Sequence, residues 1–156
     1  MDAFLLIKWL HVTGATVLLG AGAAIAFFML MANRTKDPAL IAHVAGTVVL
    51  ADLLFTASAV VVQPLTGLAL AGFDRQPLLH GWIGLSLILY LVAGAFWLPV
   101  VFIQLRMRDL ARAAAAQGAP LPAQYHRLYR VWFAFGFPAF AAVLGIIWLM
   151  VAKPSL

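Results

Sequence analysis

The chain has 156 residues, of which 65% are hydrophobic and only 10% are charged, and its mean hydropathy is +1.04. Soluble domains carry about 25% charged residues, and a soluble domain of this length buries only about 70% of its chain surface, so a water-soluble globule is excluded. All five acidic residues are Asp and Cys is absent, which excludes carboxylate-clustered di-iron sites, thiolate zinc sites, iron–sulfur clusters and disulfides.

Four apolar segments are each long enough to cross a bilayer, which takes about 20 residues. A backbone in lipid must satisfy its own hydrogen bonds, and the segments lack the alternation of barrel strands, so they are expected to be helical. Polar stretches separate them, and the longest is Arg106–Arg130. The sequence therefore predicts an all-α, polytopic membrane protein, a single-domain bundle of four transmembrane helices over residues of about 3–32, 40–70, 79–105 and 122–152.

The ten basic residues are unevenly distributed between the two ends of these helices. Seven lie in or beside the first and third connections, and the other three are Lys8, Arg75 and Lys153. By the positive-inside rule, the first and third connections face the cytoplasm and both termini face outward, in a bacterial cytoplasmic (inner) membrane. The same rule explains the net charge of +5 without nucleic-acid binding. Tyr125, Tyr129 and Trp132 are then expected in the aromatic belt at the inner interface.

The four histidines fall into two pairs, one at each membrane face. His11 and His80 lie near the outer ends of the first and third helices, and His43 and His126 near the inner ends of the second and fourth. Two imidazoles on different helices can hold a haem iron in a membrane bundle. We expect haem b with His11 and His80 as iron ligands, and a weaker second site at His43 and His126. The alternative for the second pair is hydrogen bonding to water or headgroups.

Asp52 is the only carboxylate expected at mid-membrane. It lies on a polar stripe of the second helix, which at helical spacing includes Asp52, Thr56, Gln63 and Thr66. An ionised Asp at the centre of a bilayer costs about 2.5–3.5 kcal/mol, so it must be protonated, paired or exposed to water. His43 points to the opposite face of the same helix, and a partner for Asp52 must therefore come from another helix. Asp52 is either a proton relay or substrate contact, or an interhelical hydrogen-bonding group.

Two short segments resemble the HemJ-like membrane proteins, which are haem-associated protoporphyrinogen oxidases. Leu5–His11 is similar to their Lys-x-x-His start, and the stretch from Tyr129–Arg130 to Lys153–Pro154 is similar to their last helix. The resemblance implies cofactor contacts by His11 and, more weakly, by Lys8 and Arg130. It does not imply the oxidation itself, because Ser86 stands where those proteins have a Lys, and the chain has no Glu.

A resemblance over nearly the whole chain is to a bacterial family of integral membrane proteins, DUF2269. It is carried by Asp52–Phe55, by Gln63–Leu68 and by the residues between Trp97 and Met107. This resemblance implies a fold and no activity.

Three classes of function remain open from the sequence. The first is a b-type haem-binding protein for redox chemistry or electron transfer, which would make it a haem-dependent membrane oxidoreductase. The second is a non-catalytic membrane subunit or assembly factor, and the third is a small proton-coupled transporter that uses Asp52. The expected surroundings are the lipid bilayer, with a second copy of the chain or a redox protein as partner.

Overall fold

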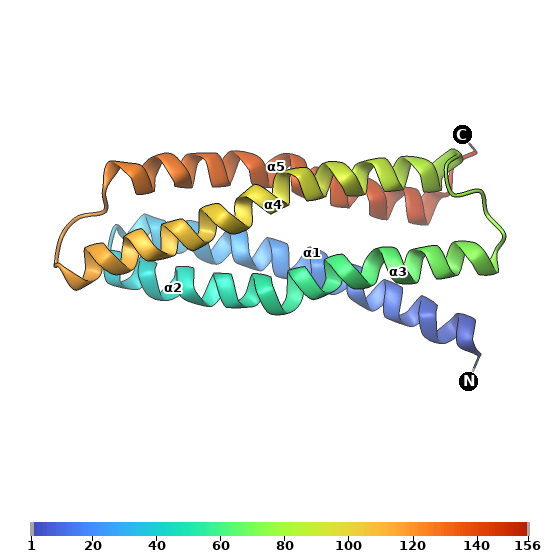
Figure 1. Ribbon diagram of the computed structural model, residues 1–156, viewed down its shortest axis with the longest axis horizontal. Coiled ribbons are helices and arrows are strands. Elements are labelled where there is room, and N and C mark those ends of the chain that lie inside the picture. Colours follow the sequence, from blue (N-terminus) through green and yellow to red (C-terminus); the bar gives the residue numbers. More distant parts are fainter. Residues whose placement is uncertain (1, 156) are drawn as a thin grey trace.

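The computed structural model describes residues 2–155, and every regular element in that range is a helix (Figure 1). The elements are α1 (Ala3–Thr35), α2 (Pro38–Ala51), the π-helix η1 (Asp52–Thr56), α3 (Ala57–Phe73), α4 (Gly81–Ala116) and α5 (Ala123–Ala152). Since α2, η1 and α3 follow one another without a break, the helices form four segments that are long and apolar enough to cross a membrane. The predicted four-helix membrane bundle is confirmed.

The helix ends follow from local sequence. Asp2 and Asp37 are N-cap residues whose carboxylates accept hydrogen bonds from backbone N–H groups near the starts of α1 and α2, as N-cap side chains commonly do. Pro38 occupies the first turn of α2, where its missing N–H costs nothing. Lys36 ends α1 with a left-handed backbone, at φ 58°, so the chain reverses direction within two residues.

One helix continues well beyond its expected membrane-spanning part, through the polar stretch that follows it. The third span was expected to end near residue 105, but α4 continues to Ala116. The continuation is rich in Ala and Arg, which are strong helix formers, and it lacks Gly and Pro. The helix ends only where Gly118 adopts a positive φ of 59°.

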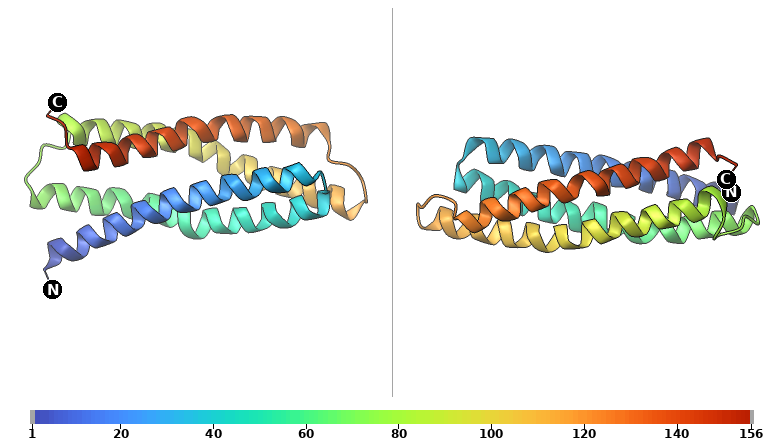
Figure 2. Two further views of the ribbon diagram at one scale, coloured as in Figure 1. Left: turned by 180° about the vertical axis from the view of Figure 1, so that it is seen from behind. Right: turned by 90° about the horizontal axis from the view of Figure 1, so that it is seen from above.

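The two ends of the bundle are different (Figures 1 and 2). One end, which we call the terminal end, holds both chain termini and the α3–α4 connection. The other, which we call the hairpin end, holds the α1–α2 and α4–α5 connections. Seven of the ten basic residues lie near the hairpin end.

The buried core is concentrated in the half of the bundle nearest the hairpin end. Met29, Ile41, Met107 and Tyr125 are its largest fully buried side chains, and they come from α1, α2, α4 and α5 respectively. Nearer the terminal end, α1 packs chiefly on α3, and α4 chiefly on α5. Large apolar side chains around the outside of the bundle are exposed, as expected for a surface that faces lipid.

Candidate functional site

Asp52 lies inside the bundle on an unusual segment of helix. It is 5% exposed and is the first residue of η1, which joins α2 to α3 within one membrane-spanning segment. A π-helical turn holds more residues than an α-helical turn, which locally changes the directions of its side chains, and such turns are frequent at functional sites. The π-helix therefore places the only predicted mid-membrane carboxylate at a distortion of its own helix.

The partners of Asp52 come from α4, as the sequence required of another helix. The indole Nε1 of Trp97 donates to Asp52 Oδ1 at 3.3 Å. The amide nitrogen of Gln104 faces the other carboxyl oxygen and donates to Asp52 Oδ2 at 3.2 Å, while its amide oxygen accepts from Trp132 Nε1 of α5 at 3.0 Å. This amide orientation is the one in which both polar atoms of Gln104 have partners. Four side chains from three segments thus form one buried network.

A fifth polar group lies beside this network. Thr56 is 6% exposed, and its hydroxyl has no hydrogen-bond partner within residues 2–155. It is the last residue of η1, four positions after Asp52. Buried hydroxyls are normally hydrogen-bonded. Because this one has no partner, it can accept a hydrogen bond from, or donate one to, a group at the Asp52 site.

His11 belongs to a second, separate polar cluster between α1 and α3. Its Nδ1 lies 2.8 Å from Thr66 Oγ1, and the Thr66 hydroxyl donates to the Val62 carbonyl at 2.7 Å. Since that hydroxyl has one hydrogen, it accepts from His11, which therefore carries its proton on Nδ1 and a lone pair on Nε2. Gln63 donates its amide to the His11 carbonyl at 2.9 Å.

A glycine makes room for this imidazole. A Cβ added to Gly67 of α3 would lie only 3.2 Å from His11 Cε1. The ring is therefore packed directly against the α3 backbone. His11 is held from one side by packing and from another by Thr66.

Comparison with known proteins identifies the family of this chain but no activity. The profile of the family described as "predicted integral membrane protein (DUF2269)" matches residues 5–154. The chain belongs to the DUF2269 family. No curated protein and no solved structure matches it.

The other histidines of this DUF2269 protein are more exposed than His11. His80 is the N-cap of α4 and is exposed, as are His43 on α2 and His126 on α5. Within residues 2–155, no hydrogen bond joins any two histidines, and no group of three or more His or Asp side chains could hold a metal ion. The structure therefore gives His11 a defined environment and leaves the pairing of His11 with His80 a prediction.

Lys8 and Arg130, the two basic residues that the HemJ-like resemblance singled out, are both exposed. The Lys8 ammonium lies over the Phe4 ring, 5.8 Å from its centroid. Ser86, at the position of the missing Lys, is buried and donates to the Trp82 carbonyl at 2.7 Å. None of these three side chains contacts His11 through a hydrogen bond in the described part of the chain.

Two aromatic residues of the DUF2269 chain do not lie in the interfacial belt that was expected from the sequence. Tyr125 is fully buried, and its hydroxyl donates to Asn33 Oδ1 of α1 at 2.9 Å. Trp132 is 5% exposed and donates to Gln104. The assignment to a lipid-facing belt was wrong for both, because their polar atoms have partners inside the bundle.

Sequence reasoning missed Trp97, Gln104 and Trp132. A signal for the first two existed. Residues seven apart share a helix face, and Gln104 is the single uncharged polar side chain, apart from the Trp97 indole, between residues 91 and 105. No comparable signal marked Trp132, because its role depends on how α5 packs against α4.

Proposed function

We propose that this integral membrane protein is a small proton-coupled transporter in which Asp52 carries the proton. The observation that carries the proposal is the chemistry around its carboxyl group, which is buried at mid-span and bonded to neutral donors. The one ion pair within residues 2–155 joins Arg108 to Asp109. Asp52 therefore has no countercharge there.

Neutral donors suit a carboxyl group that changes its protonation state. Trp97 and Gln104 can donate to the oxygens of an ionised Asp52, and they can still donate to lone pairs when the group is protonated. The added proton has an acceptor nearby in Thr56, whose hydroxyl is otherwise without a partner. A permanent Arg or Lys partner would instead hold the carboxylate ionised.

Polar side chains extend from Asp52 toward both ends of the bundle. Thr56, Gln63 and Thr66 continue toward the terminal end, where Thr66 meets His11. Gln104 and Trp132 lie on the other side of the carboxyl group. Intramembrane ionisable residues are functional by default, and chains of them are typical of proton relays.

Transport also needs helices that can bend. Pro64, Pro99 and Pro138 lie inside α3, α4 and α5, respectively. Each removes a backbone hydrogen bond from its helix, and such sites are where membrane helices kink. Pro99 is two residues after Trp97, so bending there would move a donor of the Asp52 network. We further propose, from the basic residues near the hairpin end, that this end faces the cytoplasm of a bacterial cell and that both termini face outward.

Infrared difference spectroscopy between high and low pH tests whether Asp52 exchanges protons, without knowledge of the substrate. We expect a protonated-carboxyl band that Asp52→Asn removes and Asp109→Asn retains. Proteoliposomes with an internal pH dye, under an imposed membrane potential, then test whether Asp52→Asn reduces proton entry. A buried carboxyl band that does not change with pH would mean a static interhelical group. The non-catalytic subunit would then be the better account.

His11 favours a second function, a haem b-dependent redox protein. A ligating imidazole commonly donates one ring N–H to a neighbour and binds the metal through the other nitrogen, and His11 has this arrangement with Thr66. The group would supply one-electron chemistry, held by His11 and, as the sequence predicts, by His80. Since His80 starts α4 and α1 packs chiefly on α3, this ligation requires the start of α4 to approach α1. An absorbance spectrum of protein purified after expression with ample haem tests it through the Soret band.

A further inference from the structure

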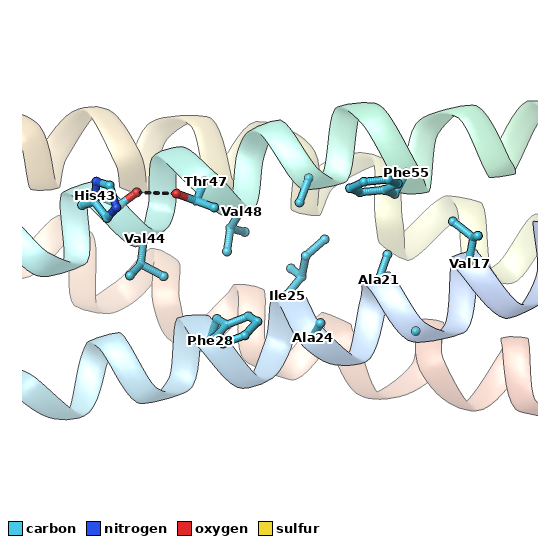
Figure 3. Close-up of a pocket in the computed structure, with 12 residues that line it drawn as sticks. Val17, Ala21, Ala24, Ile25, Phe28, His43, Val44, Thr47, Val48 and Phe55 are labelled. Carbon is cyan, nitrogen blue, oxygen red and sulfur yellow. Dashed lines mark hydrogen bonds between the residues drawn. The ribbon is translucent and has the colours of Figure 1, made fainter.

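Two adjoining hollows lie on the sides of α2, near the hairpin end. The first is an apolar groove of about 590 Å³ between α1 and α2. Figure 3 shows its walls, with Val17, Ala21, Ile25 and Phe28 on α1 and with Val44 and Val48 on α2. The groove is long and narrow in this view, with Phe55 near one end and His43 near the other.

The second hollow is polar and has a volume of about 430 Å³. It lies between α2 and α4, and its polar lining comes from His43, Thr47 and Arg112. His43 and Thr47 also line the apolar groove, so the two hollows meet at these residues. Together, the polar hollow with its Arg112 side chain and the apolar groove form one continuous depression.

The position of Arg112 depends on a glycine in the facing helix. A Cβ on Gly46 would lie 3.2 Å from the Arg112 Nη2 atom. The absent side chain therefore lets the guanidinium group lie against α2. The ion pair found within residues 2–155 uses Arg108 and Asp109, and no Asp lines the polar hollow. Arg112 is thus an exposed positive charge beside a groove, with no carboxylate partner in the described part of the chain.

The polar hollow lies close to the hairpin end of α2. His43 lies five residues after Pro38, the first residue of α2, and a helix rises about 1.5 Å per residue. The polar hollow is therefore about 8 Å from the helix end, while the apolar groove extends farther toward mid-membrane.

We propose that these two hollows bind one anionic phospholipid of the surrounding membrane. Its phosphate contacts Arg112, with His43 as a further hydrogen-bonding group, and one acyl chain lies along the α1–α2 groove. Basic pockets between transmembrane helices bind anionic headgroups, and guanidinium groups suit phosphate oxygens geometrically. The apolar groove favours a lipid over a free phosphate ion, because a small anion would use only the polar hollow. The positive charge of Arg112 favours an anionic lipid over a zwitterionic one, because no acidic side chain in the lining of either hollow offsets it.

Native mass spectrometry of the detergent-purified protein, with added phosphatidylglycerol or phosphatidylcholine, tests this site. We expect tighter binding of one phosphatidylglycerol molecule, and an affinity about tenfold lower in Arg112→Gln, which corresponds to about 1.4 kcal/mol. Arg106→Gln is the matched control, because Arg106 lies on the same helix, is exposed and lines neither hollow. It loses the same charge and should bind like the unaltered protein.

A second variant keeps every charge and changes only the space available to the Arg112 side chain. Gly46→Val places side-chain atoms where the Arg112 guanidinium lies, so it should also weaken phosphatidylglycerol binding, and it is informative if Arg112→Gln does not fold. Equal binding of the two lipids, or equal weakening by Arg106→Gln, would overturn the proposal. Displacement of the lipid by inorganic phosphate at millimolar concentration would show a small-anion site instead. None of these outcomes depends on proton exchange at Asp52.

Discussion

Trp97 donates its indole N–H to Asp52 at 3.3 Å, although 45 residues separate the two in sequence. Gln104 lies about two helical turns after Trp97 and reaches the second carboxyl oxygen. One face of α4 therefore supplies both of these donors, and the carboxyl group of η1 fixes how α4 is aligned along the second span. This relationship predicts how the network responds when its members are changed.

Replacing Asp52 by Ala should destabilise the protein more than replacing it by Asn. Alanine leaves the N–H groups of half-buried Trp97 and buried Gln104 without an acceptor, and an orphaned buried donor costs about 1–3 kcal/mol. Asparagine keeps one acceptor oxygen and nearly the same shape. Thermal unfolding in detergent, followed by circular dichroism, should give the lower midpoint for Asp52→Ala. Equal midpoints would show that the network contributes little to stability.

Gln104 and Trp132 should behave as a coupled pair. Gln104→Leu removes the acceptor of the Trp132 N–H, and Trp132→Phe removes that donor, so each single change should cost about 1–3 kcal/mol of the free energy of unfolding. The double variant should cost less than the sum of the two single changes, because the shared bond is lost only once. Gln117→Leu, at the exposed end of α4, serves as the control. Additive costs would contradict the bond between Gln104 and Trp132.

The sequence predicted the spans well because their signal is local. A stretch of about 20 apolar residues marks a spanning helix whatever surrounds it, and the stripe from Asp52 to Thr66 followed from helical spacing alone. The buried position of Asp52 and its need for a partner on another helix were predicted in the same way.

The partners themselves could not be predicted, because they depend on contacts between helices. Which residue of α4 faces Asp52 is set by the crossing of two spans and by the change of helix type at η1, and neither is written in the apolar pattern. Tyr125 shows the same limit. Its position near a polar loop is typical of an interfacial belt, but its direction into the bundle depends on where Asn33 of α1 lies.

Tyr125→Phe should measure the value of that contact. The change removes the hydroxyl that donates to Asn33 and leaves the amide oxygen of this half-buried residue without this donor, so we expect a loss of about 1 kcal/mol in the free energy of unfolding. Tyr129→Phe is the matched control, since the Tyr129 hydroxyl makes no hydrogen bond within residues 2–155. Denaturant titration of the two variants should separate them. Equal losses would assign the effect to general packing.

A reporter enzyme that is active only outside the cytoplasm tests the orientation. Both termini lie at the same end of the bundle (Figure 1), and that end has the fewer basic residues, so a reporter fused after Leu156 should be active. A reporter in the α4–α5 connection, near Gly118, should be inactive. The opposite pattern would reverse the proposed orientation and place the lipid site in the outer leaflet.

The bond between His11 and Thr66 makes a specific prediction for haem binding. If His11 is an iron ligand through Nε2, then His11→Ala should remove or shift the Soret band of haem-supplied protein, and His80→Ala should do the same. Thr66→Val keeps the shape of the side chain but removes the oxygen that accepts the Nδ1 proton. Since losing such a neighbour typically weakens metal binding by about 10- to 100-fold, Thr66→Val should retain haem less tightly while the protein remains folded. His43→Ala should leave a haem held by His11 and His80 intact, because His43 lies on α2 near the hairpin end. Colourless unaltered protein would reject the haem proposal, and a Soret band unchanged in Thr66→Val would show that the His11–Thr66 bond does not support ligation.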